Sequence, residues 1–337
     1  DFQALTEKLI QDFDKNKEYD VSIGHTWNEG NVSADEEILK ADDLMYAEKQ
    51  RYYHAILQGD RMARAGIATE LLRDIADHRF EVHYQPQICL KTGRIIGAEA
   101  LVRKRSKRGN LILPDRFIPH YERERVICHL DLFVFQTVCA DWENWKKQGI
   151  ETHISSKFSR VTLMASDVVG QIKQICQEYG VPAEKITIEV TESISKLDPQ
   201  QLIDLMNQIA AEGFSVSLDD FGSKYSNLSI LTTLDFNEIK FDKSLVDKLS
   251  SDAKSRIVMK NTMQICRELP MTRSLAEGIE TVEQLNLLHQ YHCDHGQGYY
   301  FARPMNAESF LELLKKEQML GTSVLIQSNP YGTGKME

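Results

Sequence analysis

Residues 80–103 read FEVHYQPQICLKTGRIIGAEALVR, and this stretch gives the first indication of the fold. Phe80–Cys89 and Ile95–Val102 are apolar, strand-like runs. Between them, Lys91-Thr-Gly93 has the turn chemistry of a tight connection, because glycine adopts the positive φ that such turns need. The sequence therefore predicts a hairpin of two strands at this point.

From the hairpin onward, strand-like runs alternate with amphipathic helical patterns. Six further strands are expected at His153–Phe158, Ile186–Val190, Phe214–Leu218, Glu238–Phe241, Arg273–Ala276 and Gly298–Phe301. Helices are expected near 115–149, 162–180, 199–212, 224–234, 243–268, 281–292 and 306–318. About eight strands in roughly 240 residues, mostly followed by helices, favour an α/β fold that closes into a barrel. The hairpin departs from the ideal version of that barrel.

The chain of 337 residues is long enough for one large domain and a smaller piece. We expect the barrel over residues 79–320, a connecting helix over 58–78, and a loose tail over 321–337. Residues 1–57 have the pattern of a small α/β fragment with one strand and two helices. Such a fragment cannot close a core alone, and the initial Asp1 suggests that the chain was cut from a longer protein.

The composition restricts the partners. A net charge of −10 argues against a nucleic-acid duplex, because phosphate backbones bind basic surfaces. A small anionic nucleotide remains compatible with this charge if metal ions bridge it to the protein. The six cysteines are scattered, which indicates reduced thiols in a cytoplasmic protein. No apolar run approaches the roughly 18 residues of a membrane span, although a longer parent protein could be attached to a membrane.

Acidic residues recur near the ends of the expected strands: Glu99, Glu189, Glu192, Asp219, Asp220 and Glu277. The carboxyl ends of barrel strands meet at one mouth, so these side chains would repel one another unless cations neutralise them. All-oxygen ligands suit Mg²⁺ or Mn²⁺, and bridging carboxylates suit a two-metal phosphoester hydrolase. The alternative is that the acids only cap helices, but isolated caps would not place carboxylates on so many strand ends.

These motifs, taken in order, resemble the EAL family. Glu99-Ala-Leu101 with Arg103 resembles the signature that names the family. The other motifs are Tyr84-Gln-Pro86, Glu189-Val-Thr-Glu192, Asp219-Asp-Phe-Gly222, Ile239-Lys-Phe-Asp242, Ala276-Glu-Gly-Ile-Glu280 and Gln297-Gly-Tyr299. The resemblance covers about residues 75–318. It implies a TIM-like (β/α)8 barrel whose first strand is antiparallel, which would account for the hairpin.

The resemblance also implies a bacterial signalling protein with a pocket for cyclic-di-GMP, which active members hydrolyse to linear pGpG. Gln85 and Arg103 match contacts to this ligand, and an arginine fork suits phosphate oxygens. A homodimer formed through the barrel is implied as well.

Four acids match metal ligands in this family. Glu99, Glu189 and Asp219 resemble the ligands of a first Mg²⁺ or Mn²⁺ ion, and Asp219 would bridge to a second ion with Asp220 nearby.

Four more positions match residues that act on water or shape the site. Lys240 and Glu277 match residues that position or activate the attacking water. Glu192 matches the residue that braces the loop after the paired aspartates, and Gln297 matches the glutamine that closes the site.

The first 57 residues resemble the closing section of a GGDEF diguanylate cyclase domain. Val21-Ser-Ile-Gly24, Ala41-Asp-Asp-Leu-Met-Tyr46 and Lys49 carry this second resemblance. The signature loop is absent, so no cyclase activity follows from it.

Two lysines depart from the EAL pattern. Lys157, in Ile154-Ser-Ser-Lys-Phe-Ser-Arg160, stands where a metal-binding asparagine is expected. Deprotonating a free lysine at pH 7 costs about 4–5 kcal/mol, so we expect a charged Lys157 within salt-bridge reach of at least one of Glu99, Glu189 and Asp219, in place of the first metal. Lys224 stands where a glycine is usual, which suggests a different loop conformation or a merely exposed side chain.

Three functions remain open. In the first, the barrel is a degenerate, weakly active or inactive module that binds cyclic-di-GMP or serves as a scaffold, and Lys157 favours this hypothesis. Alternatively it is an active metal-dependent phosphodiesterase that tolerates Lys157. The third alternative is a dimerisation or interaction domain, which would have no need of Arg103, Gln85, Lys240, Glu277 and Gln297.

Overall fold

The computed structural model describes residues 66–165, 167–192, 194, 198–223 and 228–321. The expected α/β fragment at 1–57, the first part of the connecting helix, Lys224 and the tail from 322 lie outside these residues. We describe the unit that begins at Glu70 by itself.

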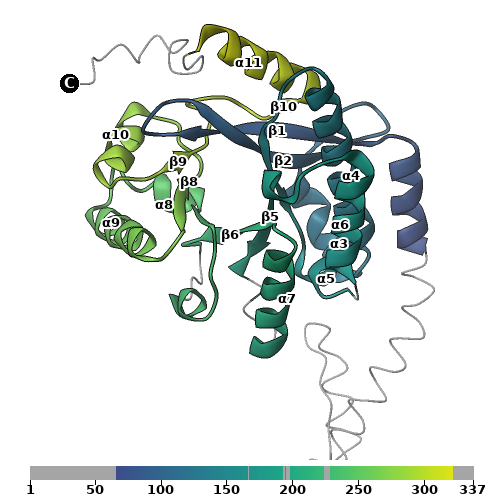
Figure 1. Ribbon diagram of the computed structural model, residues 1–337, viewed down its shortest axis with the longest axis horizontal. Coiled ribbons are helices and arrows are strands. Elements are labelled where there is room, and N and C mark those ends of the chain that lie inside the picture. Colours follow the sequence, from purple (N-terminus) through teal and green to yellow (C-terminus); the bar gives the residue numbers. More distant parts are fainter. Residues whose placement is uncertain (1–65, 166, 193, 195–197, 224–227, 322–337) are drawn as a thin grey trace, which may run out of the picture. The chain divides into compact units, whose positions relative to one another are not determined.

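Eight strands close into a ring. In the order β1-β2-β4-β5-β6-β7-β8-β9, each strand pairs with the next, and β9 pairs back with β1. The strands are β1 (Phe80–Cys89), β2 (Ile95–Arg105), β4 (His153–Lys157), β5 (Ile186–Thr191), β6 (Ser215–Phe221), β7 (Glu238–Phe241), β8 (Arg273–Ala276) and β9 (His295–Gly296). Helices surround this ring (Figure 1). The predicted TIM-like barrel is therefore confirmed.

The first strand runs against its two neighbours, as expected. β1 is antiparallel to both β2 and β9, whereas every pairing from β2 round to β9 is parallel. The connecting turn bonds Gly93 N to Cys89 O at 2.7 Å and Cys89 N to Arg94 O at 2.9 Å. Gly93 has φ 71°, a conformation that glycine adopts without steric cost.

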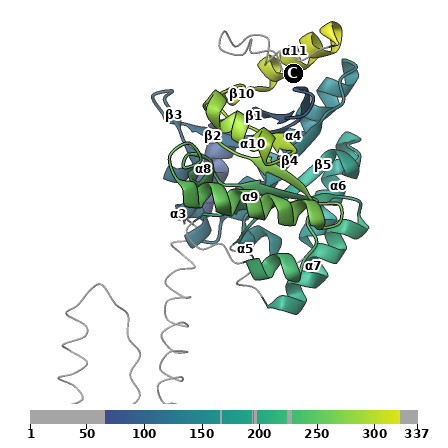
Figure 2. The ribbon, with the colours of Figure 1, turned by 90° about the vertical axis from the view of Figure 1, so that its left-hand side faces the viewer.

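The outer layer follows the alternation predicted from sequence. It consists of α3 (Ile118–Arg123), α4 (Ile127–Lys147), α5 (Arg160–Leu163), α6 (Val168–Tyr179), α7 (Pro199–Ala211), α8 (Lys243–Val246), α9 (Ala253–Glu268), α10 (Val282–Gln290) and α11 (Ala307–Leu320). Short 3₁₀ turns η1 (Pro114–Arg116), η2 (Ala183–Lys185) and η4 (Leu228–Thr232) connect some of them. Two short strands, β3 (Leu111–Ile112) and β10 (Met305–Asn306), extend β2 and β1 (Figure 2).

Five expected elements differ. The expected helix at 162–180 is divided into α5 and α6, and the described part of the expected helix at 224–234 contains only the 3₁₀ turn η4. The last barrel strand is β9 rather than Gly298–Phe301, which forms a turn in which Phe301 N bonds Gly298 O at 3.1 Å. The expected helix at 115–149 is interrupted before α4 by Arg125, which has φ 55°. The expected helix at 243–268 is divided into α8 and α9, and Asp252 caps α9.

The core lies between the ring and its helices. Tyr84, on the outward face of β1, packs its ring 4.9 Å from Trp145 of α4 and 5.7 Å from Phe310 of α11. Its hydroxyl donates to Asp141 Oδ2 at 2.6 Å, which satisfies the buried polar group. The next residue, Gln85, consequently faces the inside of the barrel, because successive side chains of a strand alternate. Among the described residues, no helix is both long and apolar enough to cross a membrane.

Candidate active site

The barrel brings the predicted catalytic and metal-ligating residues together around Lys240. Its ammonium nitrogen lies within 3.3 Å of four carboxylates: Glu99 at 3.1 Å, Glu189 at 2.9 Å, Asp219 at 3.3 Å and Glu277 at 2.8 Å. These side chains come from β2, β5, β6 and the end of β8, and Lys240 comes from β7. The prediction that strand-end acids share one mouth agrees with this arrangement.

Burial makes the charges of this cluster strongly interdependent. Lys240 and Glu189 are both 0% exposed. Burial opposes the charged form of Lys240, but Asp219, Glu189, Glu277 and Glu99 outweigh it and raise the pKa of this lysine well above its usual value. Burial together with the nearby Glu99 raises the pKa of Glu189 well above that of an ordinary glutamate. The cluster thus carries more carboxylates than one ammonium can neutralise.

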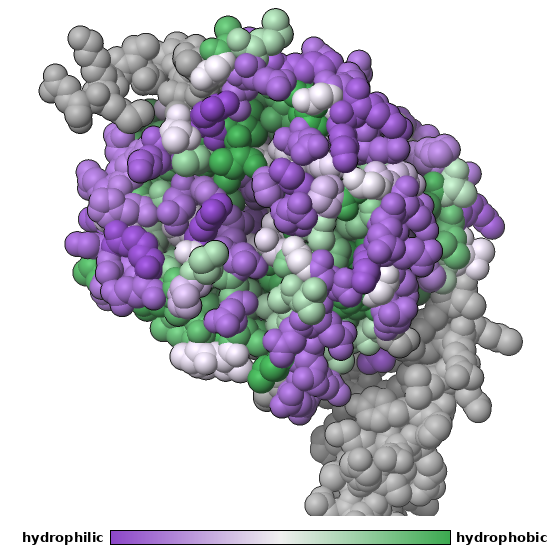
Figure 3. All heavy atoms as spheres, viewed as in Figure 1, coloured by the Kyte–Doolittle hydropathy of each residue, from purple (hydrophilic) through white to green (hydrophobic). Residues whose placement is uncertain are grey.

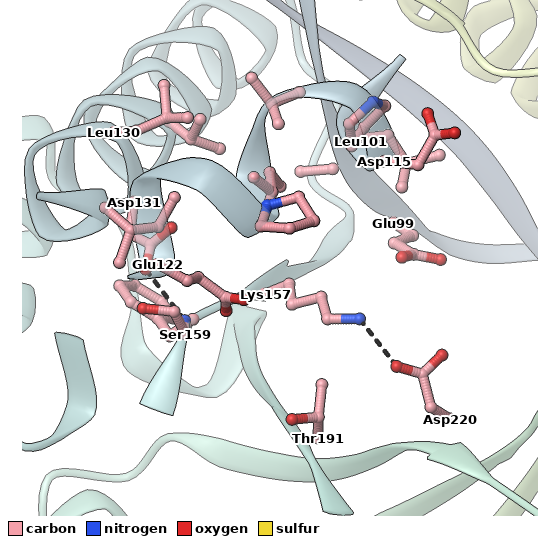
Figure 4. A pocket seen from close by; sticks show the side chains of 18 of the residues that line it. Glu99, Leu101, Asp115, Glu122, Leu130, Asp131, Lys157, Ser159, Thr191 and Asp220 are labelled. Atoms are coloured by element: carbon pink, nitrogen blue, oxygen red, sulfur yellow. Dashed lines mark hydrogen bonds and ion pairs between the residues drawn. The ribbon is translucent and has the colours of Figure 1, made fainter. Parts of the chain in front are cut away.

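Lys157 supplies a second ammonium, from the end of β4. Its nitrogen lies 2.7 Å from Asp219 Oδ2 and 3.1 Å from Asp220 Oδ2. Burial opposes its charge, but the two aspartates outweigh this and raise its pKa. Figure 4 shows the side chain extended across the pocket toward Asp220. The expected internal counter-ion is present and pairs with Asp219, one of its three expected partners, and also with Asp220.

The paired aspartates lie at an irregularity of the sheet. The β6–β7 register shifts between Leu218 and Phe221, and Asp220 has φ 59°. Such a bulge turns two successive side chains toward one side, and bulges are frequent beside active sites. Gly222 follows with φ 90°, which disfavours a side chain, and a Cβ there would also require the Leu245 side chain to move, because it would lie 1.9 Å from Leu245 Cδ1.

One group of acids fits a divalent cation. Asp219, Asp220 and Glu277 each offer an oxygen, and these oxygens lie within 4.8 Å of one another. Oxygen ligands of this kind suit Mg²⁺ or Mn²⁺. The two lysines contact these carboxylates as well as Glu99 and Glu189: Lys157 lies 2.7 Å from Asp219 and 3.1 Å from Asp220, and Lys240 lies 2.8 Å from Glu277. A cation at this position would therefore compete with both ammonium groups.

The pKa of Glu277 makes cation binding depend on pH. Burial raises the pKa of this carboxyl to about 8, although Lys240 opposes the shift. Below that pH the carboxyl is mostly protonated and must lose its proton to bind a metal, so affinity should rise by up to about tenfold per pH unit and level off above pH 8. Mn²⁺ titrations between pH 6 and 9, followed by electron paramagnetic resonance, measure this. Glu277→Gln should flatten the profile. A wild-type affinity for Mn²⁺ that does not change between pH 6 and 8 would contradict the assignment.

The remaining predicted residues lie at the same mouth. Gln297 donates from Nε2 to Glu99 Oε2 and, at 3.4 Å, to Glu277 Oε1. Gln85 is buried and donates to Ala302 O at 3.2 Å. Arg103 is 8% exposed, and its Nη1 donates to Val102 O at 2.9 Å. Glu192 lines the same cavity as Glu99 and Asp220.

That cavity has a volume of about 570 Å³ and opens beside the charged cluster. Its walls combine apolar residues of β2, α3 and α4 with the acids Asp115, Glu122 and Asp131. Figure 4 shows Asp131 beside Ser159, away from Lys157. Asp131 Oδ2 accepts bonds from Ser159 N at 2.9 Å and Thr162 Oγ1 at 2.6 Å, so it fixes the start of α5 directly after β4. Polar residues dominate the protein face shown in Figure 3.

Sequence reasoning missed two residues near this mouth. Tyr299 is 50% exposed, and the guanidinium of Arg303 lies 4.1 Å from its ring centroid. An exposed aromatic ring beside an arginine suits a flat anionic ligand. The sequence signals were the Gln297-Gly-Tyr299 motif for Tyr299 and proximity to that motif for Arg303.

The amino-acid sequence matches a known protein family and several known proteins. Residues 68–304 match the family model described as "EAL domain". The chain is 29% identical over 325 residues to Signaling protein YkoW of Bacillus subtilis, covering 92% of this chain and 40% of that protein. It is 27% identical over 326 residues to the bifunctional diguanylate cyclase/cyclic di-GMP phosphodiesterase MucR of Pseudomonas aeruginosa, covering 92% and 47%. The chain thus spans less than half of either relative.

A solved structure agrees with these matches. The PaMucR phosphodiesterase in complex with c-di-GMP superposes with a TM-score of 0.68 at 28% identity, covering 72% of this chain and 98% of that one.

Proposed function

The chain belongs to the EAL domain family, and on that basis we propose that its barrel binds cyclic-di-GMP at the mouth but hydrolyses it only slowly. The observation that carries this proposal is the position of Lys157. Its ammonium lies 2.7 Å from Asp219 Oδ2, and Asp219 is one of the three carboxylates that would hold a first metal ion. Mg²⁺ demands near-ideal octahedral geometry. Lys157 therefore weakens Mg²⁺ binding in two ways, because its charge repels the ion and because it replaces an oxygen ligand.

The proposed ligand fits the chemistry of the mouth. Cyclic-di-GMP carries two phosphates and two flat bases, and the mouth offers Arg103 for phosphate oxygens. The cavity of about 570 Å³ has apolar walls and acidic groups that suit the faces and N–H edges of a purine. PaMucR, a structural neighbour, is a phosphodiesterase with c-di-GMP bound.

Residual turnover would depend on the second cation position. A Mg²⁺ or Mn²⁺ ion held by Asp219, Asp220 and Glu277 would supply Lewis acidity and a more acidic water. Glu277, with its pKa raised to about 8, would help to hold the ion only after losing its proton, so turnover should rise with pH up to about 8. Lys240 offsets negative charge that develops on a phosphoryl oxygen, and Gln297 holds Glu99 and Glu277 in place.

Two alternatives make different predictions. An active phosphodiesterase is favoured by the intact cluster of Asp219, Asp220, Glu277 and Lys240, and it requires brisk pGpG production. A pure dimerisation domain requires no nucleotide binding at all. Calorimetric titration with cyclic-di-GMP in Ca²⁺, beside pGpG production in Mg²⁺ and Mn²⁺ on the same sample, separates all three. Absence of binding would overturn our proposal.

We also propose that residues 1–57 are the closing part of a GGDEF-like domain, joined to the barrel by the helix within 58–78. Support comes from the match to MucR, which extends over 92% of this chain and whose name includes a diguanylate cyclase.

Replacement of one mouth residue tests the ligand assignment directly. Arg103→Ala should weaken cyclic-di-GMP binding by about 1.5–3 kcal/mol, because a charge-assisted contact to phosphate is lost. Calorimetry on the variant measures the change, and the exposed Arg116, which is 80% exposed on η1, provides the control substitution. An unchanged dissociation constant for Arg103→Ala would mean that the guanidinium does not reach the ligand.

A further inference from the structure

A buried ion pair joins the helix before the barrel to the strand that carries the ligand-contacting arginine. Residues 66–76 are helical, and Asp74 near the end of this helix is only 4% exposed. Asp74 Oδ2 lies 2.6 Å from Lys104 Nζ on β2, and its Oδ1 accepts a bond from Arg79 Nη1. Buried carboxylates are rare unless paired, so Asp74 holds the helix to the side chains of Lys104 and Arg79.

Lys104 connects four elements. Its ammonium donates to Tyr121 OH of α3 at 2.9 Å and lies 5.3 Å from the ring centroid of Phe80 on β1. Burial opposes its charge, but Asp74 and Tyr121 outweigh this and raise the pKa of Lys104. The same pairing keeps the pKa of Asp74 below its usual value, against the effect of burial. The pair is therefore ionised throughout the physiological pH range.

The backbone reinforces this junction. Arg105 N donates to Arg79 O at 2.7 Å, and Arg79 Nε donates back to Arg105 O at 3.1 Å. Arg79 N also donates to Asp74 O at 2.9 Å. A displacement of the helix end would consequently pull on the last residues of β2.

Two parts of the ligand site adjoin this junction. Arg103 precedes Lys104 on β2, and alternation along a strand sends the two side chains to opposite faces, Lys104 toward the helix and Arg103 toward the mouth. Tyr121 lies on α3 between Pro119 and Glu122, which line the cavity. Lys104 thus lies on the outer side of β2, next to Arg103 in the chain, and contacts α3 through Tyr121.

We propose that Asp74 and Lys104 are positioning residues, through which the helix of residues 66–76 sets the placement of Arg103 and α3 and thereby the affinity for nucleotide. The inference rests on the proposed binding of cyclic-di-GMP. Neither Asp74 nor Lys104 is proposed to contact the ligand. Asp74 and Lys104 would thus offer one route by which a displacement of this helix reaches the site.

The test uses four variants of the full chain. Asp74→Asn and Lys104→Met remove one charge each, Lys104→Arg keeps the charge, and Glu212→Gln removes a distant pair in which Lys173 and Glu212 lie 2.7 Å apart. We expect the two neutralising variants to bind cyclic-di-GMP about tenfold more weakly, and Lys104→Arg to restore most of the affinity. Glu212→Gln should bind as the wild type does.

Hydrogen–deuterium exchange without nucleotide gives an independent readout. In Asp74→Asn and Lys104→Met, amides of 102–106 and 117–123 should exchange faster while those of β5 and β6 stay protected. If Asp74→Asn does not fold, Lys104→Met still decides, since Arg79 continues to pair with Asp74. If Lys104→Met has the nucleotide affinity and the exchange rates of the wild type, the proposed positioning role is wrong. If the wild type binds no nucleotide, the proposed function fails instead, and exchange alone reports on the junction.

Discussion

Lys157→Asn should bind Mg²⁺ and Mn²⁺ at least about tenfold more tightly than the wild type and produce pGpG correspondingly faster. The substitution removes an ammonium 2.7 Å from Asp219 Oδ2 and supplies an amide oxygen in its place. Lys157 is 43% exposed, so solvent screens its repulsion of a metal ion. A screened repulsion of only about 1.4 kcal/mol already corresponds to a tenfold change in affinity.

The assay follows pGpG across a Mg²⁺ and Mn²⁺ series for the wild type, Lys157→Asn and Lys147→Asn. Lys147 is a suitable control because it forms a surface pair with Glu143 at 2.8 Å on α4, away from the mouth. Glu99→Ala in the Lys157→Asn background should abolish any gained turnover. Brisk hydrolysis by the wild type that disappears with Glu99→Ala would restore the active phosphodiesterase.

Lys240→Met should destabilise the barrel by about 3–5 kcal/mol at pH 7.5 in the absence of divalent cations. The ammonium is 0% exposed among four carboxylates, and removing one member of a buried ionic cluster leaves the others without compensation. The pKa of Lys240 is raised in the folded state, so its contribution is complete below the pKa of an unfolded lysine and is lost only at still higher pH. At pH 7.5 the full effect is therefore measured.

Thermal and urea unfolding of wild type, Lys240→Met and the exposed control Lys260→Met test this expectation. For a domain of this size, the loss corresponds to a fall in Tm of about 6–20 °C. The deficit should shrink toward pH 5, because the orphaned carboxylates can then be protonated, and it should shrink with added Mn²⁺. A Tm for Lys240→Met equal to that of Lys260→Met at pH 7.5 would show that the carboxylates do not depend on this lysine.

The ring of strands could be predicted from sequence because burial on both faces gives a parallel strand a short apolar run with a polar residue at its end. Glu238–Phe241 and Arg273–Ala276 were predicted with the bounds that the structure has. The strand expected at Gly298–Phe301 is wrong, because a buried aromatic residue such as Phe301 also suits a packed turn. The break at Arg125 had no signal either, since its positive φ occurs in a residue type that rarely adopts it.

The site was predictable in its members but not in its pairings. Lys157 lies opposite Glu189 in the β4–β5 register, which supports the expected ion pair. However, Glu189 is paired with Lys240 at 2.9 Å, and Lys157 extends to the aspartates of β6, where the two lysines contact different oxygens of Asp219. Likewise, no pattern links Asp74 with Lys104, because the pair forms only once the helix end folds against β2.

The reversed first strand has a consequence for how this barrel can be joined to other proteins. Because β1 is antiparallel, it starts where β2 ends, and Phe80 pairs with Lys104. In a barrel of uniformly parallel strands, a chain that enters the first strand does so at the floor, remote from the chemistry. Here the entering chain arrives at the rim. A sensor fused ahead of Phe80 would need no route through the barrel to influence the reaction, and the first contact of such a sensor with the barrel would lie at the rim.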